Sequence, residues 1–274
     1  MRAAFRIRGL IAIVGFLISL GLTAQPALAQ PETITIAAAN SLKDALRKVL
    51  PLFEAEHRNI NVRVIYGPSQ TLRSQIEQGA PVDIFLPSLF EEIDQLEAKG
   101  LIIQGTKRAF AATSLVLITG TALPAPISTI QDLQTIPIRH IAVGDPKTSS
   151  VGKVSAQFLK YSKLEPKLKS QYVLGEHSRA VLDLVAKGEA EIGVVYRTDA
   201  ISNPGVRILD TAPVGSHTPV RYGVAAAWTA QNITAAGDFI EFLLSPTIQT
   251  QLQEFGFDRV SPEVGFAQRE EVKP

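Results

Sequence analysis

The sequence predicts an α/β protein of two lobes, each a mostly parallel sheet flanked by helices. From Thr33 onward, short runs of β-branched residues alternate with amphipathic stretches, which is the pattern of repeated βα units. Two short segments, 111–114 and 219–222, are interpreted as crossings between the lobes. One lobe, 30–112 plus 221–274, is then built from both ends of the chain, and the other lobe is 113–220.

The predicted strands are short and bounded by turn-forming residues. In chain order they are 33–38, 62–66, 84–86, 114–118, 141–144, 172–174, 192–196, 206–209 and 222–226. Helices are predicted between them.

The predicted helices show apolar residues at helical spacing. The clearest is 41–56, which has one apolar face. Helices 69–78 and 178–187 each end just before a glycine, the residue most often found past a helix end. Two further helices, 235–244 and 246–255, are predicted to pack on the first lobe or on the hinge.

The first 29 residues predict an export signal. Arg2, Arg6 and Arg8 precede an apolar run over 10–22, and small residues follow it. The run is shorter than the roughly 20 residues that span a bilayer. We therefore expect cleavage after Ala29 and release into the periplasm. Because the chain has no Cys, we expect no lipid anchor.

The composition argues against several classes of protein. Loss of the signal removes three Arg and lowers the formal net charge of +1 by three, and no cluster of Lys and Arg predicts binding to nucleic acid. The absence of Cys excludes disulfides and thiolate metal sites. No phosphate-binding loop occurs, because Val154 follows Lys153 where Ser or Thr is required. We expect that the protein is not an enzyme and that it carries no cofactor.

Four predicted helices begin just after a strand, at the sheet edge where α/β proteins bind ligands. These starts lie at Ser41, Ser69, Val151 and Ser178. Hydroxyls and free backbone N–H groups that meet at one edge would bind an anion. A single serine in this position is usually an N-cap, but four coincident sites favour an anion site.

Cations stand in or near the first turns of these helices, where the helix dipole disfavours them. They are Lys43, Arg73, Lys153 and Arg179. A bound anion would offset this cost; alternatively, each side chain extends into water. Tyr196 ends a predicted strand at the same edge, where its phenol would either donate to an anion or pack under a loop.

In these segments the sequence resembles the periplasmic molybdate-binding proteins of ABC transporters, from Thr33 to about Phe257. The segments that carry the resemblance are Ala38-Ala39-Asn40-Ser41-Leu42, Thr71-Leu72 with Gln75-Ile76-Glu77, Gly79-Ala80-Pro81-Val82-Asp83, Ala142-Val143-Gly144-Asp145-Pro146, and Gly193-Val194-Val195-Tyr196 with Asp199-Ala200. The resemblance implies a class II periplasmic-binding fold whose lobes close on molybdate or tungstate. It also implies delivery to a membrane permease with a cytoplasmic ATPase, and we expect a monomer.

The resemblance also implies which residues contact the oxyanion. Ser41 and Ser69 would use hydroxyl and backbone N–H, Val151 and Ser178 backbone N–H, and Tyr196 its hydroxyl. The molybdenum would then be held only through its oxygens, with no direct metal ligand.

Two positions depart from the family pattern and bear on selectivity. Val151 stands where small residues are usual, and His177 with Ser178 replaces what is often Asp or Asn followed by Val. Sulfate or another oxyanion therefore remains an alternative ligand. A ferric carrier is a weaker alternative because the five Tyr are scattered. A secreted serine hydrolase is the alternative from another class, although no Gly-x-Ser-x-Gly elbow occurs.

Overall fold

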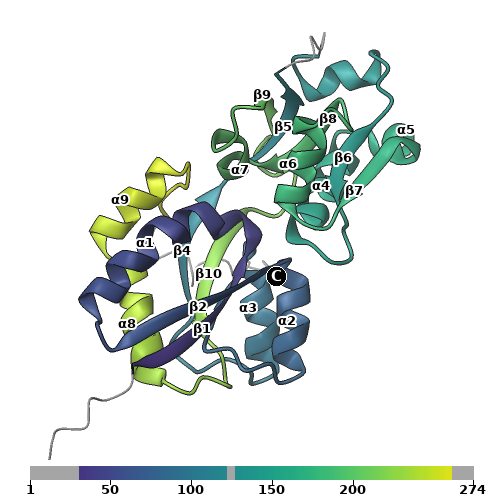
Figure 1. The fold of residues 1–274 in the computed structure, drawn as a ribbon. Coiled ribbons are helices and arrows are strands. Elements are labelled where there is room, and N and C mark those ends of the chain that lie inside the picture. The colour runs from purple at the N-terminus through teal and green to yellow at the C-terminus, as the bar shows by residue number, and fades with distance from the viewer. Residues whose placement is uncertain (1–30, 122–126, 261–274) are drawn as a thin grey trace, which may run out of the picture. The chain divides into compact units, whose positions relative to one another are not determined.

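A computed structural model of the chain describes residues 31–121 and 127–260 (Figure 1). The predicted export signal lies outside these ranges. Within them, none of the helices combines the length and the apolar character that a membrane span requires.

The first lobe is built on a five-stranded sheet with the order β2-β1-β3-β10-β4 (Figure 1). Its strands are β1 (Glu32–Ala39), β2 (Ile60–Gly67), β3 (Ile84–Leu86), β4 (Arg108–Thr113) and β10 (Val220–Ala226). β1 runs parallel to β2 and β3, whereas β10 is antiparallel to both β3 and β4. The chain leaves this sheet after β4 and returns to it in β10, so distant segments of sequence lie side by side.

The second lobe repeats this layout with the strand order β7-β6-β8-β5-β9. Its strands are β5 (Leu115–Gly120), β6 (Ile141–Gly144), β7 (Tyr172–Gly175), β8 (Ile192–Tyr196) and β9 (Val206–Thr211). β6 is parallel to β7 and β8, whereas β5 is antiparallel to β8 and β9. Each lobe thus offers a row of parallel strands whose carboxyl ends share one edge.

The two-lobed α/β class is confirmed, and both sheets are mixed rather than mostly parallel, with two of four pairings antiparallel in each. The antiparallel strands β5 and β10 are entered from the other lobe, without a crossover helix to bring the chain back in the parallel direction. All nine predicted strands are present. β4 was missed because residues 111–114 were read as a crossing only.

Helices cover both faces of each sheet (Figure 1). In the first lobe they are η1 (Asn40–Leu42), α1 (Lys43–Glu56), α2 (Ser69–Glu77), α3 (Glu91–Ala98), α8 (Ile233–Leu244) and α9 (Pro246–Glu254). In the second lobe they are η2 (Ile130–Gln134), α4 (Ser150–Tyr161), α5 (Glu165–Leu168), η3 (Lys169–Gln171), α6 (Ser178–Ala186) and α7 (Arg197–Ile201).

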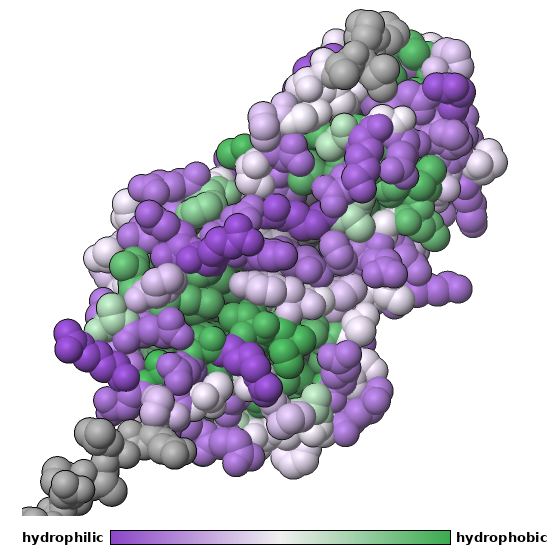
Figure 2. Space-filling model, in the orientation of Figure 1, coloured by the Kyte–Doolittle hydropathy of each residue, from purple (hydrophilic) through white to green (hydrophobic). Residues whose placement is uncertain are grey.

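Buried apolar side chains join each sheet to its helices. One cluster packs α2 and α3 on a face of the first sheet, and another packs α6 and α7 on a face of the second. A third cluster joins α1, α8 and α9 to the first sheet and α4 and α5 to the second. Figure 2 shows hydrophobic residues gathered over β1 and β2 in a mostly hydrophilic surface. The helix starts are therefore held by well-packed cores.

Candidate functional site

One pocket is lined by residues of both lobes at the carboxyl ends of the parallel strands. The first lobe contributes Ala39, Asn40, Ser41, Gly67, Pro68, Ser69 and Ser88, and the second contributes Ser149, Ser150, Val151, His177, Ser178 and Tyr196. The cavity is about 20 Å³, somewhat more than the roughly 10–15 Å³ needed by one water. All five residues predicted to contact the ligand line it. No Asp, Glu, Lys or Arg is among the described residues that do so.

Ser41 lies in η1 and does not cap a helix. The residues at the N-cap positions of η1 and α1 are Ala39 and Leu42. The Ser41 Oγ instead accepts a hydrogen bond of 2.8 Å from the hydroxyl of Tyr222. Because Ser41 accepts this bond, its own hydroxyl hydrogen is left to be donated elsewhere. The N-cap alternative therefore fails at this position.

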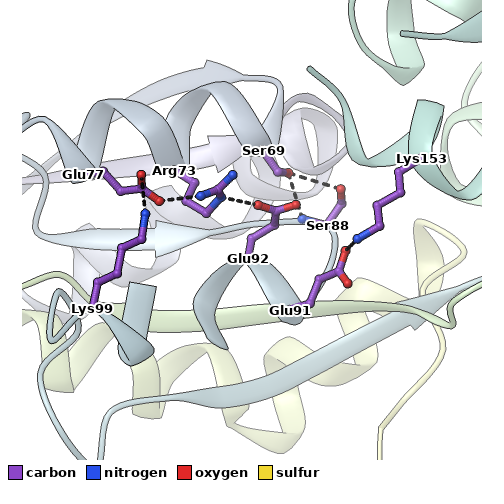
Figure 3. Close-up of polar contacts among 8 residues, drawn as sticks. All are labelled: Ser69, Arg73, Glu77, Ser88, Glu91, Glu92, Lys99 and Lys153. Carbon is purple, nitrogen blue, oxygen red and sulfur yellow. Dashed lines mark hydrogen bonds and ion pairs between the residues drawn. The ribbon is translucent and has the colours of Figure 1, made fainter. Parts of the chain in front are cut away.

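Ser69 is the first residue of α2, and it too is free of a capping role because Pro68 occupies the N-cap. Its Oγ accepts from the backbone N–H of Ser88 at 3.1 Å and lies 3.2 Å from the Ser88 Oγ (Figure 3). The Ser88 Oγ in turn lies 3.3 Å from the hydroxyl of Tyr196. This chain of hydroxyls crosses from the first lobe to the second.

Ser88 was not among the predicted site residues. It follows the carboxyl end of β3 by two positions, so it stands at the same sheet edge as the other serines. The signal that would have found it is the serine just past a buried strand. It was overlooked because no helix begins there: α3 starts only at Glu91.

The start of α4 brings Val151 to the pocket. Ser149 is the N-cap and accepts from the backbone N–H of Gly152 at 3.2 Å. A Cβ at Gly152 would lie 2.4 Å from the backbone carbonyl of Asp145, so only glycine lets the helix approach this loop so closely. The backbone N–H groups of Ser150 and Val151, at the first two positions of the helix, have no carbonyl partner within it and are available to an anion.

The start of α6 is capped by a histidine. The His177 Nδ1 accepts from the backbone N–H of Ala180 at 3.1 Å, and burial lowers the pKa of His177. In the neutral ring, the remaining hydrogen therefore sits on Nε2. Ser178, the first residue of the helix, is 4% exposed and presents its own backbone N–H at this positive helix end.

Tyr196 ends β8 and is 1% exposed, so it is fully buried rather than half-buried under a loop. Burial raises the pKa of its phenol well above the ordinary value, which keeps the hydroxyl protonated and able to donate. Its ring meets that of Tyr222 edge-on, with centroids 6.2 Å apart. Asn40 adds a further candidate donor, since its buried Nδ2 has no partner in the part of the chain that the structure describes.

The cations near these helix starts do not line the pocket, and three of the four pair with carboxylates. Arg73 Nε lies 2.7 Å from Glu92 and Lys153 Nζ lies 2.5 Å from Glu91, as Figure 3 shows. Of these four cations, only Lys43 has an exposed side chain, as the alternative of extension into water predicts. Carboxylates therefore neutralise Arg73 and Lys153, which the sequence analysis did not predict.

Arg179 joins the lobes by a similar contact. Its Nη2 donates to the Asp44 carboxylate of the first lobe at 2.5 Å, and its Nε lies 2.8 Å from Oδ1 of Asp199 without hydrogen-bond geometry. Asp199 is completely buried, and burial raises its pKa to about 6 despite the opposing effect of Arg179. Charge is thus balanced around the pocket while the lining itself remains neutral.

The family model described as bacterial extracellular solute-binding protein matches residues 34–258. The chain belongs to this family. The predicted resemblance is confirmed by the molybdate-binding protein ModA of Escherichia coli (strain K12), which is 31% identical over 84% of this chain and 91% of its own length. The putative ABC transporter substrate-binding lipoprotein YvgL of Bacillus subtilis (strain 168) is 29% identical over 90% of this chain and 95% of its own.

Solved structures agree with this assignment. The substrate-binding domain of a putative molybdenum ABC transporter from Clostridium difficile is 32% identical to this solute-binding protein, with a TM-score of 0.67 and coverage of 84% of this chain and 99% of the other. The sulfate-binding protein SubI of Mycobacterium tuberculosis H37Rv has a TM-score of 0.74 at 20% identity over 85% and 88% of the two chains, which shows a shared fold alone.

These relatives decide the class of protein. They are solute-binding components and not enzymes, so the hydrolase alternative is excluded. The family acts outside the cytoplasm as the substrate-binding part of ABC importers. Within the described ranges, no group of three His, Asp or Glu side chains is arranged to hold a metal ion.

Proposed function

We propose that this protein binds molybdate or tungstate and delivers it to an ABC importer. The observation that carries the proposal is a pocket of neutral donors drawn from both lobes, with no charged side chain among the described residues that line it. The proposed contacts are Ser41, Ser69, Val151, Ser178 and Tyr196. A doubly negative tetrahedral ion offers four acceptor oxygens and no hydrogen, which matches donors of this kind.

Neutral donors are strong enough for the task. A hydrogen bond to a charged group contributes about 1.5–3 kcal/mol, so five proposed contacts correspond to roughly 8–15 kcal/mol before ordering costs. Micromolar to nanomolar binding requires about 8–12 kcal/mol. The positive ends of α2, α4 and α6 add to this attraction because the first residues of these helices line the pocket.

The distribution of donors over two lobes gives the ligand a way to signal its presence. Each lobe supplies only part of the contacts, so the ion stabilises the arrangement in which the lobes meet around it. A permease that recognises this arrangement receives loaded protein in preference to empty protein. We propose that the lobes divide near residues 112 and 220, as the sequence predicts.

We further propose that the protein works as a monomer in the periplasm after cleavage at Ala29, without a lipid anchor. The absence of Cys supports only the last of these points, because a lipid anchor is attached to a cysteine. The partners would be a membrane permease and its cytoplasmic ATPase, by likeness to the relatives named above.

Sulfate is the second candidate ligand. It is also a fully ionised tetrahedral dianion, and the fold is shared with a sulfate-binding protein. The same donors would serve both ions, so size must discriminate between them. Val151, which is 2% exposed and lines the pocket, is the side chain that would set this size.

Thermal unfolding tests the proposal. Protein from residue 30 onward is melted with molybdate, tungstate, sulfate or phosphate, each at the same concentration. Ligand at 100 times Kd stabilises the fold by about 2.7 kcal/mol, which raises Tm by roughly 5–10 °C for a chain of this size. Molybdate and tungstate are expected to give the largest shifts. A larger shift with sulfate would replace the proposal by the second candidate, and no shift with any of the four would refute both.

A further inference from the structure

We infer that the hydroxyl of Ser150 is an additional donor to the bound oxyanion, an inference that rests on the proposed function. Ser150 is the first residue of α4 and lines the pocket beside Val151. It belongs neither to the predicted contacts nor to the chain of hydroxyls that links Ser69, Ser88 and Tyr196.

The Ser150 hydroxyl is buried and has no hydrogen-bond partner in the described part of the chain. Its side chain is 2% exposed, and its Oγ meets no donor or acceptor among the described residues. Buried hydroxyls in folded proteins are almost always bonded, and an exception calls for an explanation. A ligand that occupies the pocket would supply the missing partner.

Local helix geometry does not use this hydroxyl. The neighbouring Ser149 already caps α4 by accepting from the backbone N–H of Gly152. Ser41 and Ser69, in contrast, both have partners in the protein. Among the described serines that line the pocket, Ser150 is therefore the one whose buried hydroxyl makes no hydrogen bond within the protein.

The electrostatic setting favours donation to an anion. Ser150 lies in the first turn of α4, where unpaired backbone N–H groups create a positive potential. An oxyanion oxygen that accepts the proposed hydrogen bond from the backbone N–H of Val151 would lie close to the hydroxyl of the adjacent Ser150. The same setting disfavours a cation, and no carboxylate lines this part of the described pocket.

An unpaired buried hydroxyl should also destabilise the protein when no ligand is bound. Removing it relieves the cost of burying an unsatisfied polar group. The Ser150 hydroxyl would then strengthen ligand binding while it lowers the stability of the ligand-free protein, a trade-off that is common in binding sites. The two effects provide separate measurements of the same assignment.

The test compares Ser150→Ala with Ser155→Ala. Ser155 is on the same helix and is 0% exposed, and its Oγ has no partner among the residues that the structure describes, but it does not line the pocket. We expect Ser150→Ala to weaken molybdate binding by about tenfold or more, the loss typical of a hydrogen bond to a charged group. Ser155→Ala should leave Kd within about twofold of the wild type. Both variants should melt at or above the temperature of the ligand-free wild type.

Titration calorimetry of the three proteins with molybdate, tungstate and sulfate separates the outcomes. If the wild type binds one of these ions and Ser150→Ala binds it as tightly, this inference is wrong and the proposed function stands. If the wild type binds none of them, the proposed function fails and the inference fails with it. Ser150→Gly, which also lacks the hydroxyl, must reproduce the loss seen in Ser150→Ala; wild-type affinity in this second variant would overturn the assignment.

Discussion

Tyr222→Phe tests whether the pocket is prepared for its ligand by a residue that does not line it. Tyr222 is 0% exposed, and its hydroxyl donates to Ser41 Oγ at 2.8 Å. Its ring packs edge-on against Tyr196 and Phe257, with centroids 6.2 and 5.1 Å away. The substitution removes one oxygen and keeps the ring, so the apolar packing should persist.

The expected magnitudes follow from the bond that is lost. One neutral hydrogen bond contributes about 0.5–1.5 kcal/mol, so Tm should fall by about 1–6 °C. Ser41→Ala removes a proposed bond to a charged oxygen and should weaken binding about 10–150-fold. Tyr222→Phe leaves the Ser41 hydroxyl in place but no longer fixes it, so a smaller loss of about fivefold is expected.

A double-mutant cycle decides whether Tyr222 acts through Ser41. Calorimetric titration with molybdate is carried out on the wild type, both single variants and the double variant. Once Ser41 is alanine, Tyr222→Phe should have no further effect on Kd. Equal losses in both backgrounds would refute the reasoning. Tyr172→Phe is the control, because the buried hydroxyl of Tyr172 has no partner within residues 31–121 and 127–260 and Tyr172 does not line the pocket.

Three further predictions follow from the same geometry. Ser69→Ala, which removes the acceptor of a buried backbone N–H, should weaken molybdate binding about tenfold in calorimetry while the circular dichroism spectrum stays that of a folded protein. Glu91→Gln breaks the ion pair between Glu91 and Lys153, whose side chains are 29% and 34% exposed, respectively. Because solvent screens a pair of this kind, the Kd for molybdate should rise less than about fivefold, and less still at 0.5 M salt. A larger rise would mean that this pair governs closure of the lobes. Burial raises the pKa of Asp199 to about 6, whereas the unfolded chain has a value of about 3.9. As pH falls, the folded state therefore binds a proton at Asp199 before the unfolded state does. The free energy of unfolding should increase between pH 7 and pH 4, by at most about 3 kcal/mol. Urea unfolding at pH 7 and pH 5 measures this gain, and Asp199→Asn should abolish it; an equal gain in the variant would assign it to other groups.

Local sequence signals were sufficient for most of the secondary structure. The segment 141–144 is apolar and β-branched, ends in glycine and becomes β6, with the bounds predicted. The start of α4 follows it because Ser149 caps the helix and Gly152 permits close packing. Such signals act over a few residues, and the sequence displays them directly.

Several of the missed features depend on partners that are distant in sequence. Arg179 pairs with Asp44 across 135 positions, so nothing near Arg179 shows that its charge is neutralised. Ser88 joins Ser69 and Tyr196 across 19 and 108 positions. The antiparallel course of β10 is likewise set by β3 and β4.

The sequence by itself determined the order of strands and helices, the serines at the strand ends and, by resemblance, the family. Only the tertiary structure decided that Ser41 and Ser69 are not caps, that carboxylates neutralise the neighbouring cations, and that Ser88 and Ser150 belong to the pocket. The physical reason is one of range. Backbone preferences and hydrophobic periodicity are read within a few residues, whereas the partner of a hydroxyl or a charge is chosen by whatever the packed lobes bring within about 3 Å of it.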